Sequence, residues 1–404
     1  MLREYQKETV EKLKWSADIA GNDLISLPTG SGKSHVIAEV ALNNGKDVLI
    51  LQPSREILEQ NRDKLQAIVG KDVVGVYSAS LGSKVIKKYT FATIGSIYKK
   101  PEDFIHFNLI IIDECHLLNP KRPSGMFLKF INKVNQLKGS PIKIIGLTAT
   151  PYRLTQQYVR YKNGFVDTIT TIKLINRVRC KDGSTFWNRL IFNINVGDLI
   201  AQGFLCPLKY HNITLVKQED MKLNISHSDF DLTAFEKQIE KKDEEIYNVL
   251  EACSKNFKST LVFCPTVENA EKIADMFFDG EVVSAKTKPR ERKRIIEGFK
   301  SGEIKMVFNV GVLTTGFDHP ALDCIVLLRP SRSIGLVSQM VGRGLRLSPD
   351  KKFCTIIDFT DTINKIGRIE SFKLEKIDGK WNLTTETNKT GFNGVELYRF
   401  TIQK

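Results

Sequence analysis

The chain has 404 residues, of which 42% are hydrophobic and 26% are charged. This length exceeds one ordinary hydrophobic core and predicts two domains with additional segments. No stretch approaches the roughly 20 apolar residues of a membrane helix, and the N-terminus lacks the apolar core of a signal peptide. We therefore expect a cytoplasmic protein that does not associate with membranes.

The composition is basic and carries no metal-binding cysteine pattern. The formal net charge is +14, from 60 Lys and Arg against 46 Asp and Glu. Such a charge is consistent with a polyanionic partner, although many basic proteins bind no nucleic acid. The seven cysteines are scattered, without a C-x-x-C pair or a Cys/His cluster. We therefore expect no zinc site.

The first half of the chain alternates short apolar runs with helical patterns. Such runs are typical of buried parallel strands. The expected strands are Asp23–Leu27, Asp47–Leu51, Asn108–Ile112 and Lys143–Leu147, and the expected helices include Ser34–Asn43 and Arg55–Val69. Repeated strand–helix units with short connections predict a doubly wound parallel sheet. Ligands of such sheets bind beyond the carboxyl ends of the strands.

The stretch between residues 156 and 240 does not show this alternation of short apolar strands and helices. Ile172–Asn195 is rich in Thr, Ile, Asn and Arg around Asp182-Gly183, which predicts a hairpin-like insertion. Lys237–Glu245 is charge-dense, and we expect a solvated helix face there rather than a binding site.

The second half repeats the strand–helix alternation. Its expected strands are Thr260–Phe263, Glu281–Ser284, Lys305–Asn309, Cys324–Leu328 and Cys354–Asp358. They predict a second doubly wound parallel sheet, so the fold class is α/β. After Asp358 comes a tail with scattered aromatic residues among polar ones, which predicts a small β-rich appendage.

A glycine-rich loop joins the first expected strand to the first expected helix. It reads Pro28-Thr29-Gly30-Ser31-Gly32-Lys33, and Ser34 begins the helix. The N–H groups of such a loop converge on phosphates at a helix N-terminus. We expect Lys33 to contact the β- and γ-phosphates of ATP and Ser34 to offer its hydroxyl to Mg²⁺. Leu27 replaces the first glycine of the general pattern, so a plain glycine-rich turn is the alternative.

Two acids follow the apolar strand predicted at Asn108–Ile112. They are Asp113 and Glu114, followed by Cys115 and His116. We expect Asp113 to hold Mg²⁺, directly or through water, and Glu114 to polarise an attacking water. The alternative is a simple cap of the next turn. His116 is expected either to couple the ATP site to domain motion or to pack in the turn.

These motifs, together with Gly146-Leu147-Thr148-Ala149-Thr150-Pro151, resemble the series of superfamily 2 helicases of the DExH type. The resemblance implies two tandem RecA-like domains, ATP and Mg²⁺ as cofactors, and a coupling role for Thr148 and Thr150. Leu2-Arg3-x-Tyr5-Gln6 resembles the adenine-reading motif, with Gln6 as base reader and Arg3 as stacking residue. We expect domains at 1–208, with the insertion near 156–200, and at 209–363, and the appendage at 364–404.

Within that superfamily the chain resembles the RadD family of bacterial DNA-repair ATPases. The shared stretches are LPTGSGKSHVIAE, IIDECH, GLTATPYRL, NVGVLTTGFD, LLRPSRS and QMVGRGLRL. The Cys-rich zinc-binding region into which RadD proteins continue is not found in this sequence. A branch-migrating helicase resembling the phage protein UvsW, or a free-standing relative of restriction-enzyme motor subunits, is the alternative likeness.

The resemblance also implies that the second half completes the ATP site. On a helix, Arg343 and Arg346 would lie on one face and could reach a γ-phosphate across an interdomain cleft. Gln339, one turn earlier, could orient the water. Gly316 and Asp318 are expected near the ribose or near these arginines. A basic helix face that contacts nucleic acid directly is the alternative.

The resemblance further implies contacts with a nucleic-acid backbone from hydroxyls, backbone N–H groups and arginines in both halves. The candidates are Ser54, Arg55, Thr93, Gly95, Ser96, Thr266 and Thr315. Lys286–Arg294 is expected to be the exposed start of a helix rather than a localisation signal. The hairpin near Arg177, Arg179 and Lys181 is a candidate for a wedge that separates strands or for a contact with the duplex.

Taken together, these features predict an ATP-dependent DNA helicase or translocase. We expect a monomer that acts on single-stranded, forked or branched DNA in repair, recombination or replication, alongside replication or recombination proteins. An RNA-acting DExH ATPase, and a remodelling ATPase without unwinding activity, are the alternatives.

Overall fold

The computed structural model describes residues 2–17, 19–160, 166–226, 228–314, 316–377, 380–385 and 396–402, with backbone only at 155–160, 166–171, 376, 377, 380 and 396–402. The chain forms two compact units, one of Met1–Arg153 with Lys173–Ile194 and one of Leu154–Ile172 with Asn195–Lys404. The domain boundaries expected at 208/209 and 363/364 stay predictions. No helix in the described part of the chain is long and apolar enough to cross a membrane.

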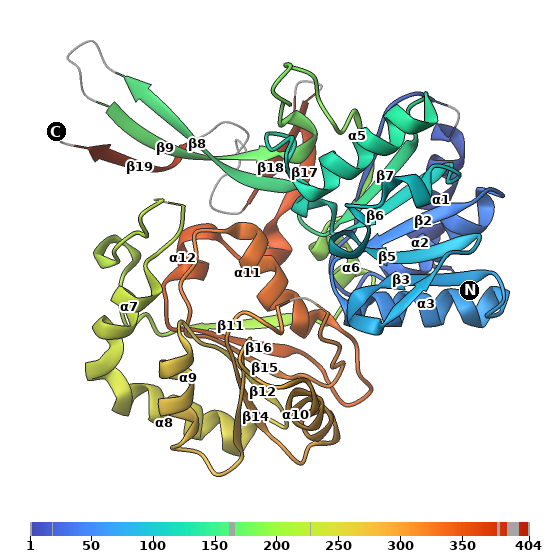
Figure 1. Cartoon of the computed structure of the whole chain (residues 1–404). Coiled ribbons are helices and arrows are strands. Elements are labelled where there is room, and N and C mark those ends of the chain that lie inside the picture. Colours follow the sequence, from blue (N-terminus) through green and yellow to red (C-terminus); the bar gives the residue numbers. More distant parts are fainter. Residues whose placement is uncertain are drawn as a thin grey trace. The chain divides into compact units, whose positions relative to one another are not determined.

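The first unit is built on a sheet in which Figure 1 shows β7, β6, β2, β5 and β3 side by side. The sheet has eight strands in the order β10-β1-β7-β6-β2-β5-β3-β4, and all pairs are parallel except β3 with β4. The strands are β1 (Asp23–Ser26), β2 (Val48–Gln52), β3 (Val74–Ser78), β4 (Ser83–Val85), β5 (Tyr89–Thr93), β6 (Leu109–Asp113), β7 (Lys143–Thr148) and β10 (Arg189–Asn193).

The central strands of this sheet are buried on both faces. Every residue of β1, β2 and β6 is buried, as expected for parallel strands covered by helices. The four strands predicted in this half are confirmed, with ends that differ by at most one residue. β3, β4, β5 and β10 were not predicted; Tyr89–Thr93 mixes threonines with its apolar residues and therefore lacks the continuous apolar run used as the signal.

The helices of the first unit connect these strands. They are α1 (Glu4–Ser16), α2 (Lys33–Asn43), α3 (Arg55–Val69), α4 (Ile94–Ile97) and α5 (Met126–Lys138), with 3-10 turns η1 (Ala79–Leu81), η2 (Pro101–Phe104), η3 (Cys115–Leu117) and η4 (Ile175–Arg177). The predicted helix at 55–69 is confirmed. The other predicted helix begins one residue early, at Lys33, because Gly32 already serves as its N-cap.

The segment between β7 and β10 contains two long strands and a tight turn. β8 (Tyr152–Arg160) and β9 (Val166–Leu174) form a small sheet with β19 (Glu396–Ile402), in the order β19-β9-β8. The turn expected at Asp182-Gly183 is present, since Gly183 has a left-handed φ of 85°. Asp182 Oδ1 accepts hydrogen bonds from the N–H and the hydroxyl of Ser184.

The second unit carries a fully parallel sheet of six strands in the order β11-β16-β15-β12-β14-β13. The strands are β11 (Leu208–Asn212), β12 (Thr260–Phe263), β13 (Gly280–Val283), β14 (Met306–Asn309), β15 (Cys324–Leu327) and β16 (Cys354–Asp358). The five strands predicted here are confirmed to within one residue at each end, and β11 was missed. Two parallel α/β sheets, as predicted, therefore organise the chain.

Helices and a small hairpin complete the second unit. The helices are α6 (Val196–Ala201), α7 (Leu232–Ile239), α8 (Asp243–Asn256), α9 (Val267–Ala274), α10 (Pro289–Ser301), α11 (Ile334–Val341) and α12 (Thr362–Ile366). The 3-10 turns are η5 (Gln218–Asp220), η6 (Glu240–Lys242), η7 (Gly342–Leu345) and η8 (Ile369–Ser371). β17 (Lys373–Ile377) pairs antiparallel with β18 (Lys380–Thr384). The basic run Lys286–Arg294 leads into α10, as expected.

Candidate active site

The phosphate-loop motif lies between β1 and α2, at the carboxyl end of the strand. Gly30 and Gly32 both adopt left-handed φ angles, of 82° and 79°, which a residue with a side chain rarely adopts. Ser31 is fully buried, and its N–H and hydroxyl both donate to Pro28 O, at 3.2 and 2.7 Å. The loop is therefore fixed by its own hydrogen bonds at the N-terminus of α2, where an anion is favoured.

Side chains at the start of α1 hold the same loop from the other side. Tyr5 Oη donates to Ser31 O at 2.5 Å, and Gln6 Nε2 donates to the same oxygen at 2.9 Å. Gln6 Oε1 accepts from Arg3 N at 2.9 Å, and Arg3 Nη1 donates to Tyr5 Oη at 3.3 Å. The structure thus brings Gln6, the expected base reader, and Arg3, the expected stacking residue, next to the phosphate loop. It adds Tyr5, to which no role had been given.

The acidic pair stands at the carboxyl end of β6, two strands away from β1 in the sheet. Glu114 follows the strand with a left-handed φ of 48°. Its Oε1 lies 2.6 Å from Lys33 Nζ, and both side chains are only 13% exposed. The two most specific motifs of the sequence therefore meet in one ion pair.

Burial and charge act differently on the two carboxyl groups. Burial alone would raise the pKa of Glu114, but the Lys33 ammonium and contacts with His116 hold it well below its usual range. Burial raises the pKa of Asp113 to about 6; the Glu114 charge adds to this rise and Lys33 opposes it. Glu114 is therefore the acid of the pair that is most firmly ionised.

The three residues expected to couple the site to motion gather around one imidazole. His116 Nδ1 lies 3.3 Å from Glu114 Oε2, 2.9 Å from Thr148 Oγ1 and 3.3 Å from Thr150 Oγ1. Thr150 N donates to Thr148 Oγ1 at 3.0 Å. This network joins Glu114 to the loop that follows β7. The His116 contacts fit either of its two expected roles, coupling to domain motion or packing in the turn, and the coupling role stays a prediction.

The residues available for Mg²⁺ are few but of the right type. Mg²⁺ is usually held by one or two carboxylates together with phosphates and waters, and Asp113 with the Ser34 hydroxyl offers such a set. Over the residues that the structure describes, no group of three or more His, Cys, Asp or Glu side chains forms a metal cage. This donor set fits a Mg²⁺ that arrives with a nucleotide.

One contact of Asp113 was not foreseen. Asn61 Nδ2 on α3 donates to Asp113 Oδ2 at 3.3 Å, while Asp113 Oδ1 accepts from Glu114 N at 2.9 Å. In the sequence, Asn61 stands between Leu58 and Leu65 at helical spacing, and this position on the apolar stripe of the predicted helix is the signal that could have found it. Both oxygens of the expected metal ligand are thus held in place.

In the second unit, the expected arginines do not share one α-helical face, so that prediction was wrong. α11 ends at Val341, Gly342–Leu345 forms a 3-10 turn, and Arg346 is extended. A Cβ at Gly344 would lie 2.5 Å from Cys354 Sγ. Because Gly344 has no side chain, the 3-10 turn can pack tightly on β16, and the backbone does not continue as an α-helix there.

Each arginine is nevertheless held by defined partners. Arg343 is buried, and its Nη1 donates to Phe317 O at 2.8 Å while its Nε donates to Gln339 O at 3.3 Å. Arg346 Nε lies 2.5 Å from Asp318 Oδ1, and Asp318 stands two residues after Gly316. Asp318 thus lies beside an arginine, as expected. The roles of these residues toward a nucleotide stay predictions.

The nucleic-acid candidates of the first unit lie at the carboxyl ends of neighbouring strands. Gln52 of β2 pairs with Thr93 of β5, so Ser54 and Ser96 follow adjacent strand ends. Ser54 Oγ accepts from Ile57 N at 3.4 Å as the N-cap of α3, and the hydroxyls of Thr93 and Ser96 lie 2.8 Å apart. A Cβ at Gly95 would meet nothing within 4 Å.

The other candidates also make local contacts. Arg55 Nε lies 3.2 Å from Glu59 Oε2, and its Nη1 donates to Ser80 O at 3.3 Å. Thr266 Oγ1 accepts from Asn269 N at 3.0 Å as the N-cap of α9, and Thr315 lies outside the described residues. Ser54 and Thr266 therefore act as helix N-caps. Contact with nucleic acid stays a prediction for every candidate.

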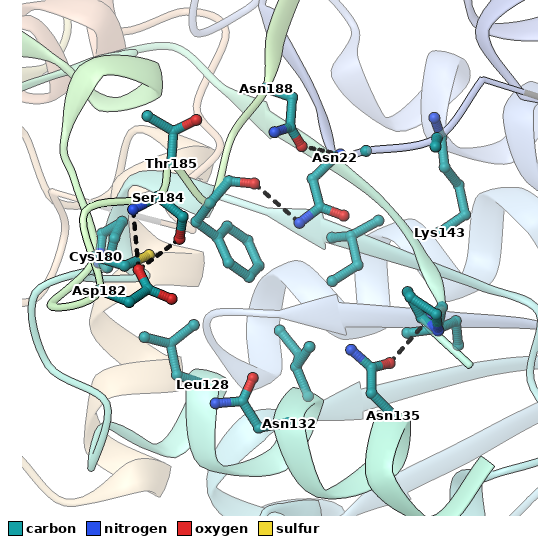
Figure 2. Close-up of a pocket in the computed structure, with 18 of the residues that line it drawn as sticks. Asn22, Leu128, Asn132, Asn135, Lys143, Cys180, Asp182, Ser184, Thr185 and Asn188 are labelled. Carbon is teal, nitrogen blue, oxygen red and sulfur yellow. Dashed lines mark hydrogen bonds between the residues drawn. The ribbon is translucent and has the colours of Figure 1, made fainter. Parts of the chain in front are cut away.

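The loop proposed as a wedge lies at the amino ends of the strands of the first sheet, whereas the phosphate loop lies at their carboxyl ends. Figure 2 shows Cys180, Asp182, Ser184 and Thr185 lining a pocket of about 790 Å³ beside Lys143 and helix α5. Lys143 begins β7, so the pocket lies at the amino ends of the strands, away from the phosphate loop. A strand-separating role for Arg177, Arg179 and Lys181 stays a prediction that this position does not favour.

Two family models match the chain. Residues 1–153 match the model described as type III restriction enzyme, res subunit, and residues 241–348 match the helicase conserved C-terminal domain. The chain is 28% identical over 385 residues to the putative ATP-dependent helicase IRC3 of Saccharomyces cerevisiae, covering 89% of this chain and 51% of that protein. It is 25% identical over 367 residues to the DNA 3'-5' translocase XPB2 of Sulfurisphaera tokodaii, covering 85% of this chain and 78% of the relative.

The chain thus spans about half the length of the yeast relative. Among solved structures, it resembles a fragment of a putative HsdR subunit of a type I restriction enzyme from Vibrio vulnificus, with a TM-score of 0.63 and 20% identity over 91% of this chain and 66% of that one. It also resembles the DNA-bound type ISP restriction-modification enzyme LlaBIII, with a TM-score of 0.61 and 17% identity over 89% of this chain and 28% of that one. The chain therefore carries two RecA-like helicase domains, of which the first matches the type III restriction res model and the second matches the helicase conserved C-terminal model.

Proposed function

We propose that this chain hydrolyses ATP to move on or remodel DNA that is single-stranded, forked or branched, in repair, recombination or replication. The observation that carries the proposal is the ion pair between Lys33 Nζ and Glu114 Oε1, at 2.6 Å. It joins a phosphate-binding lysine to an ionised carboxylate at the carboxyl edge of a parallel sheet, where ligands of such sheets bind.

The chemistry of this site suits transfer of a phosphoryl group to water. That reaction needs positioning and charge neutralisation more than covalent help. Lys33 and the N–H groups at the start of α2 neutralise phosphate charge, and Glu114 accepts a hydrogen bond from the attacking water. Asp113 and Ser34 would hold Mg²⁺, which neutralises further phosphate charge. A γ-phosphate competes with Glu114 for Lys33 and thereby frees the carboxylate to orient water.

We further propose that Arg343 and Arg346 of the second unit complete the site. Arg343 is positioned by two backbone oxygens, and Arg346 is held by a carboxylate that a phosphate can replace. A nucleotide that contacts both units would bind their closed arrangement more tightly than an open one, and would therefore favour closure. Hydrolysis would remove that ligand and allow the units to separate, which is a way to step along a strand.

Two similarities favour DNA as the polymer. One relative carries the name DNA 3'-5' translocase, and another is the EcoKI type I restriction endonuclease subunit of Escherichia coli, 24% identical to this chain. The formal net charge of +14 favours a polyanion. RNA as the polymer, and remodelling without unwinding, are alternative outcomes of the test below.

Several finer assignments belong to the same proposal. We place the chain near the RadD-type DNA-repair ATPases on the strength of the shared motif stretches, as a cytoplasmic monomer without zinc that works alongside replication or recombination proteins. The match to a restriction res model also supports the second likeness, a free-standing relative of restriction motors.

Steady-state ATPase assays with single-stranded, duplex, forked and four-way DNA, and with RNA of matched length, test the proposal. We expect DNA to stimulate turnover, with the branched and single-stranded forms stimulating most. Equal or greater stimulation by RNA would reassign the polymer. Turnover without any strand displacement on forked DNA would identify a remodelling ATPase.

A further inference from the structure

A polar residue occupies a position in α3 that normally belongs to an apolar side chain. The buried residues of this helix are Leu58, Asn61 and Leu65. Their spacing of three and four residues places them on one stripe that faces the sheet. Asn61 is only 5% exposed, although its neighbours in the stripe are leucines.

The partner of this amide explains its position. Burying an amide group is unfavourable unless it is hydrogen-bonded, and a leucine of similar size would continue the stripe. Asn61 Nδ2 donates to Asp113 Oδ2 at 3.3 Å. Since Asp113 is itself 5% exposed, the contact lies inside the domain and is shielded from water.

Two donors therefore fix the Asp113 carboxylate, one on each oxygen. Glu114 N donates to Oδ1 at 2.9 Å, and Asn61 donates to Oδ2. A carboxylate oxygen has a second lone pair, so each oxygen can still serve as a metal ligand. The two bonds set the rotation of the carboxylate, and both favour its ionised form against the burial of the group.

The helix that carries Asn61 is itself firmly placed. Ser54 caps its N-terminus, and the Leu58 and Leu65 side chains are fully buried on either side of Asn61. The amide therefore cannot follow a moving carboxylate. Instead, the carboxylate is held where the helix keeps the amide.

We propose that Asn61 is a positioning residue that orients Asp113 for Mg²⁺. This inference rests on the proposed function, because it takes Asp113 as the ligand of the Mg²⁺ that accompanies ATP. Groups that orient metal ligands typically change metal affinity or activity by about 10–100-fold when they are removed. Asn61 should therefore act on the Mg²⁺ dependence of nucleotide binding, not on nucleotide binding as such.

The test compares Asn61→Leu with a matched control, Asn135→Leu. Asn135 Oδ1 on α5 accepts from Ile142 N at 2.9 Å, a structural bond drawn in Figure 2 at the other edge of the sheet. Binding of a fluorescent ATP analogue is titrated in EDTA and at increasing MgCl2. We expect unchanged binding in EDTA for Asn61→Leu, a Mg²⁺ half-saturation raised by about 10-fold or more, and wild-type values for Asn135→Leu.

The outcomes separate this inference from the function on which it rests. A wild-type Mg²⁺ half-saturation in Asn61→Leu overturns the positioning role, and so does an equal rise in Asn135→Leu. If the wild-type chain binds the analogue without any Mg²⁺ dependence, the proposed function fails instead. Should Asn61→Leu not bind in EDTA, which would show a misfolded domain, Asn61→Ala is measured in its place with the same expectation.

Discussion

Lys33 Nζ lies 2.6 Å from Glu114 Oε1, and both side chains are 13% exposed. The lysine comes from the start of α2 and the acid from the turn after β6, 81 residues later. In the proposed mechanism, a phosphate that enters the loop takes Lys33 from Glu114. One binding event thus anchors the nucleotide and frees the carboxylate for catalysis.

Replacing Glu114 by glutamine should separate binding from hydrolysis. Glu114→Gln keeps the shape and a hydrogen-bond acceptor for Lys33 but loses the negative charge that orients water. We expect nucleotide affinity to stay within a few-fold of wild type and turnover to fall by about 10²–10⁴-fold. Nucleotide titration and steady-state ATPase measure the two quantities, and unchanged turnover would remove Glu114 from the reaction.

The contact between Gly32 and Gln6 gives a second prediction. Gly32→Ala places a Cβ 2.6 Å from Gln6 Nε2 at a φ of 79°, so it should displace Gln6 and weaken ATP binding. Gly45→Ala is the control, because Gly45 has a φ of 68° and open space around it. Both changes should cost about 1–2 kcal/mol of folding stability through their left-handed backbone. Equal ATP affinity in the two variants would argue against the Gln6 contact.

Tyr5 should matter through its hydroxyl. Tyr5→Phe removes the 2.5 Å bond to Ser31 O but keeps the buried ring, a loss of about 0.5–1.5 kcal/mol for an ordinary hydrogen bond. We expect a raised KM for ATP. Tyr77→Phe is the control, since Tyr77 is equally buried and packs edge-on against Phe104. Tyr5 holds the loop only if the KM rises in Tyr5→Phe alone.

Arg346 should act on hydrolysis and not on nucleotide binding. Arg346→Ala removes the proposed trans-acting cation, and turnover should fall by about 10³–10⁵-fold while the affinity of the first unit for ATP is kept. Arg294→Ala is the control, because Arg294 pairs with Glu281 and Glu291 on the surface of the same unit. Wild-type turnover in Arg346→Ala would contradict the proposal that the second unit completes the ATP site.

Arg55 should contribute to the salt dependence of DNA binding. If it contacts a phosphate, the slope of log affinity against log salt concentration should fall by about 1 in Arg55→Ala. Fluorescence anisotropy with labelled single-stranded DNA at several NaCl concentrations measures the slope. A slope near zero for the wild-type chain would contradict backbone contact altogether.

The sequence predicted the sheets well because their central strands are buried on both faces. The residues at 48–51 and 109–112 form continuous apolar runs, which are typical of parallel strands covered by helices on both faces. Strands at or near the edges, such as Ser83–Val85 and Arg189–Asn193, mix polar and apolar residues. Their pairing depends on distant strands, so the local pattern does not identify them.

The candidate site was predictable as a set of motifs but not as a set of contacts. Motif spacing identified Lys33 and Glu114, whereas the bond from Asn61 to Asp113 joins residues 52 positions apart. The helix expected to carry Arg346 stops early because Gly344 packs against Cys354, a residue in another strand. Each miss depends on a non-local contact that no periodicity encodes.

The most direct test of the central claim is the rate of ATP hydrolysis with and without forked DNA, for the wild-type chain and for Glu114→Gln. The proposed function predicts a slow basal rate, a clear rise with DNA in the wild type, and no rise in the variant. A wild-type rate that DNA leaves unchanged, or a variant that DNA stimulates as much as the wild type, would contradict it.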